Sequence, residues 1–90
     1  MKKVIIFGSK HWPGCTPAKE FLSTNEVKFL YLDITENLFN LKLFLKHRDY
    51  APEFKDIKES GRVGLPCIVI NDGEQIVFDY TTLDIEDIKR

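Results

Sequence analysis

The sequence predicts an α/β fold built on one mixed sheet, with helices on both of its faces. The first half alternates a short apolar run, a segment with helical spacing and a second apolar run. This order, with short connections, favours two parallel strands joined by a right-handed crossover. The second half places two apolar runs around Asn71-Asp72-Gly73, which is typical of a hairpin. With 90 residues, of which 43% are hydrophobic, we expect one domain over residues 1–90 with a core of its own.

The elements of the first half follow from their apolar spacing. Residues 3–8 form a β-branched and aromatic run without alternation, which indicates a strand buried on both faces. Apolar residues at helical spacing predict a helix up to Thr24, which begins either at Pro13 or after Thr16. A second strand is expected over residues 27–32.

The next segment predicts a helix with two apolar sides. Thr35 is a suitable N-cap for a helix over residues 36–47, whose Leu and Phe residues are too widely spread for one stripe. A second element must therefore cover the other side. Residues 52–58 are expected to form a short helix that offers Phe54 and Ile57 for this purpose.

A hairpin and a short helix complete the predicted order. The hairpin strands are expected over residues 66–70 and 74–78, with one of them antiparallel to the first pair, and apolar residues between 83 and 88 predict a brief C-terminal helix. The order is therefore βαβ, one or two helices, then ββα, which suits one sheet with helices on both faces.

Charge and hydropathy exclude several kinds of partner. The net charge of −1 provides no basic field for nucleic acid or for an anionic membrane surface. The longest apolar stretches are far too short for a membrane span, and Met1-Lys2-Lys3 leads directly into a strand rather than a signal peptide. We therefore expect a cytoplasmic monomer that binds neither nucleic acid nor membranes.

Cys15 is the first candidate functional residue. It follows the first strand and lies at or just before a helix start, where unpaired N–H groups and the helix dipole favour a thiolate over a thiol. Lys10 and His11 would add to this effect. The alternative is that Cys15 is a small buried residue in a tight turn.

Cys67 is the second candidate, because it follows a proline at the start of an apolar strand. Pro66 cannot donate a hydrogen bond within a sheet, so it marks the start of the strand. Cys67 is then either an ordinary core residue or a second thiol beside Cys15. A zinc site made of Cys15, Cys67 and His11 is not expected, because these ligands lack the close pairing typical of zinc sites.

Two segments together resemble a known family. Residues 4–15 read Val-Ile-Ile-Phe-Gly-Ser-Lys-His-Trp-Pro-Gly-Cys and open a βαβ unit, and Val63-Gly-Leu-Pro66 precedes a later strand. This pattern resembles the glutaredoxins, specifically the small bacterial glutaredoxin-related proteins, over nearly the whole chain. The resemblance implies a thioredoxin-like fold with a mixed four-stranded sheet, flanking helices, a cis Pro66 and an extra short helix before the strand that follows it.

The resemblance also implies a site and its chemistry. Cys15 takes the place of the second, resolving cysteine of a Cys-x-x-Cys motif, and Trp12 stands where the nucleophilic cysteine belongs. Pro66 lies against the helix start, and Cys67 lies near the site. The implied site residues are Trp12, Pro13, Gly14, Cys15, Pro66 and Cys67, and Lys10, His11 and Leu65 are the implied substrate contacts.

Two departures from the family pattern limit the function expected. An indole forms no mixed disulfide, so standard exchange through Trp12 is impossible and little activity is expected. The Gly-Gly-x-Asp-Asp segment that holds glutathione is absent, because residues 78–82 read Phe-Asp-Tyr-Thr-Thr. No cofactor is required, and dependence on glutathione stays open.

The two functions left open are a thiol-disulfide redox protein, impaired at Trp12 or using Cys15 with Cys67, and a non-catalytic binding module. The expected partner is a disulfide-containing protein or a small thiol.

Overall fold

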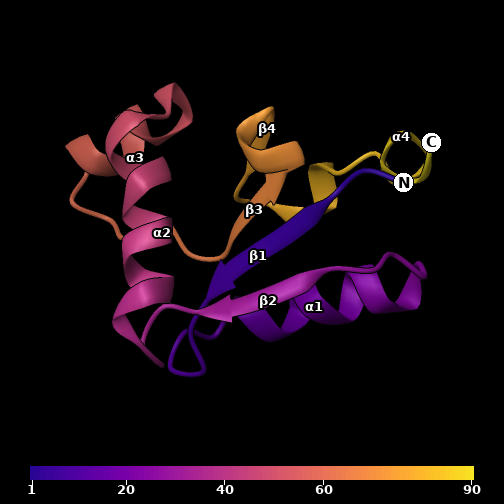
Figure 1. Ribbon diagram of the computed structural model, residues 1–90, viewed down its shortest axis with the longest axis horizontal. Helices are drawn as coiled ribbons and strands as arrows, with labels where there is room; N and C mark the ends of the chain where they lie inside the picture. Colours follow the sequence, from indigo (N-terminus) through magenta and orange to yellow (C-terminus); the bar gives the residue numbers. More distant parts are fainter.

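Four strands form one mixed sheet in the computed structural model, which describes residues 1–90 (Figure 1). They are β1 (Val4–Gly8), β2 (Leu30–Asp33), β3 (Cys67–Ile70) and β4 (Gln75–Val77), and they lie in the order β2-β1-β3-β4. β1 pairs parallel with β2 and antiparallel with β3, and β3 pairs antiparallel with β4. The predicted mixed sheet, with a parallel crossover followed by a hairpin, is confirmed.

Helices cover both faces of this sheet. They are α1 (Cys15–Thr24), α2 (Leu38–Tyr50), α3 (Lys55–Glu59) and α4 (Ile85–Lys89). α1 and α4 contribute to the core on one face, and α2 and α3 contribute to the core on the other. None of these helices has the length and apolar character needed to cross a membrane.

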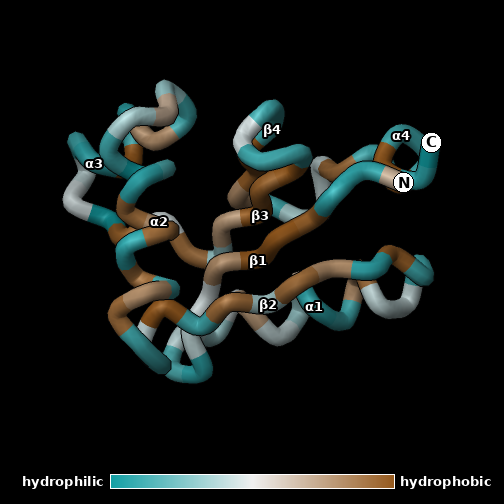
Figure 2. Tube along the Cα trace, in the orientation of Figure 1, coloured by the Kyte–Doolittle hydropathy of each residue, from teal (hydrophilic) through white to brown (hydrophobic).

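The central strands β1 and β3 explain why the sheet is buried on both sides. Successive strand residues point to opposite faces, so an unbroken apolar run supplies two cores, and both strands are brown to tan over most of their length in Figure 2. The core shared with α1 and α4 consists of Val4, Ile6, Leu22, Val27, Ile68, Ile70, Leu83 and Ile88. The core shared with α2 and α3 consists of Ile5, Phe7, Phe44, Phe54, Ile57, Cys67, Val69 and Ile76.

A chain of aromatic rings joins α2 and α3 to the sheet. The ring centroids lie 5.6 Å apart for Phe7 and Phe44, 5.8 Å for Phe44 and Phe54, and 4.8 Å for Phe54 and Phe78. Phe54 is fully buried at the junction of a 3-10 turn and α3. Phe54 packs on α2 as predicted, but against Phe44, which also faces Phe7 of the sheet. Phe39, on the opposite side of the helix, is 73% exposed, so the prediction that Phe54 and Ile57 would cover that second side is wrong at this position.

Some predicted boundaries were wrong, and local hydrogen bonds explain two of them. α2 begins at Leu38 because Asn37, not Thr35, is its N-cap, and the Asn37 side chain accepts the Asn40 N–H at 2.8 Å. Thr35 instead donates its N–H to the Asp33 carboxylate at 2.7 Å. β2 begins at Leu30 rather than at residue 27, because the N–H of Val27 is taken by the carbonyl of Leu22 at the end of α1. The N-terminal turn of α2 also leaves Leu38 and Phe39 exposed, so neither apolar side of this helix is covered along its whole length.

Candidate functional site

The loop from β1 to α1 places Trp12 and Cys15 one turn apart. The Trp12 N–H donates to the Ser9 carbonyl at 3.0 Å, and the Cys15 N–H donates to the Trp12 carbonyl at 3.3 Å. Gly14 precedes the first residue of α1, which is Cys15 itself. α1 therefore begins at Cys15, between the two starts that the sequence left open, Pro13 and the position after Thr16, and both are wrong by one or two residues. Pro17 is tolerated because it lies in the first turn.

The motif loop is anchored to the turn that follows β2. Ser9 is buried, its hydroxyl lies 3.3 Å from the Thr35 hydroxyl, and it accepts the His11 N–H at 3.1 Å. The Lys10 N–H donates to the Asp33 carboxylate at 3.1 Å. Hydrogen bonds to the Thr35 hydroxyl, and then to the N–H groups of Thr35 and Lys10, lower the pKa of Asp33. The backbone that presents the motif is thus held by a side chain that is charged at neutral pH.

The two ends of the motif differ in exposure. The side chain of Trp12 is 41% exposed, whereas Cys15 is 1% exposed. The position that the resemblance assigns to the nucleophile therefore faces solvent, but it carries an indole. The remaining motif thiol lies beneath the surface at the start of α1.

Pro66 lies against this helix start. The Leu65–Pro66 peptide bond is cis, and a Cβ added at Gly14 would lie 3.3 Å from the Cδ of Pro66. Both the cis bond and the contact with the motif, which the resemblance implied, are present in the structure. The proline loop and the motif loop therefore form adjoining walls.

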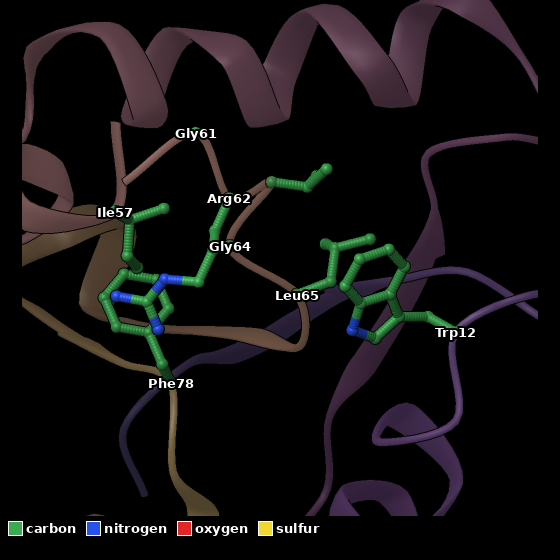
Figure 3. A pocket seen from close by; sticks show the side chains of 8 residues that line it. Trp12, Ile57, Gly61, Arg62, Gly64, Leu65 and Phe78 are labelled. Carbon is green, nitrogen blue, oxygen red and sulfur yellow. The ribbon is translucent and has the colours of Figure 1, made fainter. Parts of the chain in front are cut away.

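A groove of about 340 Å³ opens between these walls and α3 (Figure 3). Trp12 and Leu65 lie together at one end of it, and Phe78 lies at the other with the guanidinium of Arg62 beside it. The lining residues are Trp12, Ile57, Gly61, Arg62, Val63, Gly64, Leu65 and Phe78. The arrangement offers a mainly apolar surface with a single positive charge.

Arg48 of α2 fixes the loop that forms one wall of this groove. Its Nε donates to the Val63 carbonyl at 3.0 Å, and its Nη2 donates to the Arg62 carbonyl at 2.7 Å. Arg62 in turn donates from Nε to the Ser60 hydroxyl at 2.8 Å. Sequence analysis missed both arginines because their partners are backbone carbonyls and a nearby hydroxyl, which leave no spacing pattern.

Cys67 does not lie in the site that the resemblance implied for it. Its side chain is fully buried in the core shared with α2 and α3, opposite Phe7 in the sheet register. Burial first, and the charge of Glu53 second, raise the pKa of the Cys67 thiol to about 12. Of the two interpretations that the sequence left open for Cys67, the structure therefore shows the ordinary core residue. The place near the site that the resemblance implied is wrong, because the strand pleat turns Cys67 away from α1.

The remaining predicted site residues are exposed. Lys10, His11 and Pro13 all face solvent in the motif loop, and none of the three lines the groove. No group of three His, Cys, Asp or Glu side chains is placed to hold a metal ion. Of the predicted substrate contacts, only Leu65 lines the groove.

Comparisons with known proteins identify the family and the fold of the chain. The family model described as Glutaredoxin matches residues 4–76, a span that contains Trp12, Cys15 and Pro66. A protein of Haemophilus influenzae named "Uncharacterized protein" is 31% identical over 85 residues, which cover 94% of this chain and 98% of that protein. A crystal structure of a mutant of the thioredoxin-like protein BC3987 covers 97% of this chain and 95% of its own, with a TM-score of 0.57 and 23% identity. The fold is therefore thioredoxin-like, and the chain belongs to the glutaredoxin family.

Proposed function

We propose that this chain is a thiol-disulfide protein whose standard dithiol exchange is suppressed by Trp12. Membership of the glutaredoxin family supports a redox function based on thiols. The observation that carries the finer proposal is the contrast between an exposed indole at the first motif position and a buried Cys15 at the second. Exchange begins when a thiolate attacks a disulfide sulfur, so the group at the exposed position controls the first step.

The residues around Trp12 support the chemistry that a cysteine would perform there. The thiolate at this position would attack one sulfur of a disulfide, and the S–S bond would break with its electron pair leaving on the other sulfur. The Cys15 thiolate would then attack the sulfur of residue 12, form a disulfide between residues 12 and 15 and release the second thiol, and two molecules of the thiol donor would reduce that disulfide and be oxidised to their own disulfide. The turn in which the Cys15 N–H donates to the carbonyl of residue 12 keeps the two positions within one turn of each other, which favours this second step.

The direct test is Trp12→Cys, with Trp12→Ser as a matched control. Both variants remove the indole, but only the first supplies a thiol. The measurement is reduction of a small disulfide with glutathione as thiol donor. We expect background turnover from the unaltered chain and from Trp12→Ser, and robust turnover from Trp12→Cys. Robust turnover by the unaltered chain, or none by Trp12→Cys, would contradict the proposal.

The second candidate function is a non-catalytic binding module. The groove favours it, because Trp12 and Leu65 form an apolar wall and Arg62 adds one positive charge. Exposed tryptophans beside apolar pockets are frequent anchors of binding. S-methylglutathione is a suitable probe, because its thioether cannot undergo exchange. Saturable quenching of Trp12 fluorescence by this probe, together with no turnover by Trp12→Cys, would favour the binding module over the redox protein.

A further inference from the structure

The sulfur of Cys15 and the hydroxyl of Tyr31 meet at one backbone position beneath the motif loop. A Cβ added at Gly8 would lie 2.8 Å from the Cys15 sulfur, 2.8 Å from the Tyr31 hydroxyl oxygen and 2.9 Å from Cε2 of the same ring. Gly8 ends β1, Tyr31 lies on the neighbouring β2, and Cys15 begins α1. The missing side chain of Gly8 therefore leaves the space in which the thiol and the phenol approach each other.

Neighbouring groups hold the Tyr31 ring in this place. The Nζ of Lys19, one helical turn after Cys15, lies 4.1 Å from the ring centroid, within the range of a cation–π interaction. Tyr31 pairs with Ile6 in the parallel register, which fixes its backbone beside β1. The ring is half-buried, and the sulfur of Cys15 is almost fully covered.

The electrostatic environment keeps the phenol protonated. The pKa of Tyr31 is raised to about 12. Burial of the phenol is the largest cause, followed by the charges of Cys15 and Asp33 and then by hydrogen bonding with Cys15. At neutral pH the hydroxyl therefore retains its proton and can donate it in a hydrogen bond. The charged side chains around this pair are Lys19 from α1 and Asp33 from β2.

We propose that Tyr31 is a positioning residue for Cys15, whose hydroxyl donates a hydrogen bond to the sulfur and stabilises its thiolate form. A hydrogen bond to a charged acceptor stabilises more than one between neutral groups. The proposal rests on the proposed function only in taking Cys15 as the motif thiol. The reactivity of Cys15 is measurable by alkylation, which requires no disulfide exchange.

Tyr31→Phe tests this role because it removes the hydroxyl and keeps the ring beneath Lys19. Tyr80→Phe is the matched control, since Tyr80 also packs against α1, with its ring centroid 5.1 Å from that of Phe21, but is not among the nearest neighbours at Gly8, where the sulfur lies. The measurement is the rate of alkylation by iodoacetamide against pH, with each cysteine followed separately by mass spectrometry. We expect alkylation of Cys15 in Tyr31→Phe to be about tenfold slower near neutral pH, with its rate profile displaced to higher pH.

Cys67 serves as an internal monitor of folding in the same experiment. Cys15 and Cys67 are 1% and 0% exposed, so alkylation of either thiol requires the structure to open, and Cys67, in the core on the other face of the sheet, reports opening that is not local to Cys15. Three results would overturn the proposal: an unchanged Cys15 profile, a change by one constant factor at every pH, or labelling of Cys67 that rises in step with that of Cys15. The control variant is expected to match the unaltered chain.

A second measurement covers the case in which Tyr31→Phe does not fold. Cys15→Ala removes the sulfur and leaves Tyr31 in place, so the pKa of Tyr31 should fall, as followed by ultraviolet absorbance of the phenolate. No change in this titration would overturn the proposal. Failure of Trp12→Cys to gain exchange would refute the proposed function without altering these results, so the two proposals fail on different data.

Discussion

Cys15 and Cys67, the two thiols of the chain, lie on opposite faces of one sheet. The sulfur of Cys15 approaches the position that a Cβ of Gly8 would occupy, on the side of β1 covered by α1. Cys67 lies opposite Phe7, and both side chains belong to the core on the side of α2 and α3. Because neighbouring residues of a strand point to opposite faces, the backbone of β1 separates the two sulfurs.

We therefore predict that mild oxidation forms no intramolecular bridge between Cys15 and Cys67. A disulfide requires Cβ atoms about 3.5–4.5 Å apart and aimed at each other, which the intervening sheet prevents. The measurement is mass spectrometry of peptides from the oxidised protein without reduction, with Cys67→Ala as the control. A quantitative bridge formed under native conditions would show that the sheet opens far more readily than its buried core suggests.

Gly8→Ala is predicted to destabilise the protein by about 1–3 kcal/mol, as is usual for overpacking. The new methyl group would stand 2.8 Å from both the Cys15 sulfur and the Tyr31 hydroxyl, and neither partner belongs to a flexible surface side chain. The measurement is urea unfolding of Gly8→Ala, Cys15→Ala and the double variant. Because Cys15→Ala removes one of the clashing atoms, the double variant should lose less stability than the sum of the two single variants. Strict additivity would indicate that the methyl group finds space elsewhere.

The fold was predictable from the sequence because its signals are local. Unbroken apolar runs identify β1 and β3, and the Asn71-Asp72-Gly73 turn identifies the hairpin. The boundary of α2 was less predictable, since Asn37 and Thr35 are both suitable N-caps. The deciding feature is tertiary, because Asp33 already engages Thr35 and leaves Asn37 to cap the helix.

The candidate site was only partly predictable for a similar reason. Chain order places Trp12, Cys15 and Pro66 near one another once the family is known. It does not reveal that Cys67 faces away, because an unbroken apolar strand carries no alternation to indicate which face each residue takes. Tyr31 was also missed, because the sequence does not show that its hydroxyl and the Cys15 sulfur both lie beside Gly8 of the neighbouring strand.

Asp33→Asn is predicted to lower stability at neutral pH and to have little effect in acid. The pKa of Asp33 is lowered from its ordinary value of 3.8, first by the hydroxyl of Thr35, so the ionised form stabilises the folded state. This contribution is complete above the unfolded pKa and is lost as the pH falls through the folded pKa. The difference in Tm between the two proteins should therefore be present at about pH 7 and shrink below about pH 4.

Asp79→Asn provides a matched control for this effect. Asp79 also accepts hydrogen bonds from the N–H and hydroxyl of a threonine two residues later, Thr81, and its pKa is likewise lowered. Its carboxylate does not bond to the motif loop, whereas that of Asp33 accepts the Lys10 N–H. Both variants should lose pH-dependent stability, but only Asp33→Asn should alter the fluorescence of Trp12. Equal fluorescence changes in the two variants would show that Asp33 does not anchor the motif.

Gly64→Ala is predicted to distort the groove, whereas Gly61→Ala should only destabilise the protein. Both glycines line the groove and have positive φ, +99° at Gly64 and +74° at Gly61, so an alanine at either costs about 1–2 kcal/mol. Only at Gly64 does the added Cβ also meet an obstacle, the ring of Phe54 at 2.7 Å, while Gly61 has nothing within 4 Å. Phe54 is fully buried between Phe44 and Phe78, so the loop must move instead, and overpacking adds about 1–3 kcal/mol.

Movement of this loop should be visible in the fluorescence of Trp12, the single tryptophan of the chain. Gly64 adjoins Leu65, which lies beside the indole at one end of the groove (Figure 3). A displaced Leu65 would expose the indole further to water and shift its emission to longer wavelength. We expect this shift in folded Gly64→Ala and not in Gly61→Ala, with urea unfolding measured on both. An unshifted emission in Gly64→Ala would contradict this prediction. It would mean that the ring of Phe54 moves to make room for the new methyl group and that the loop keeps its place.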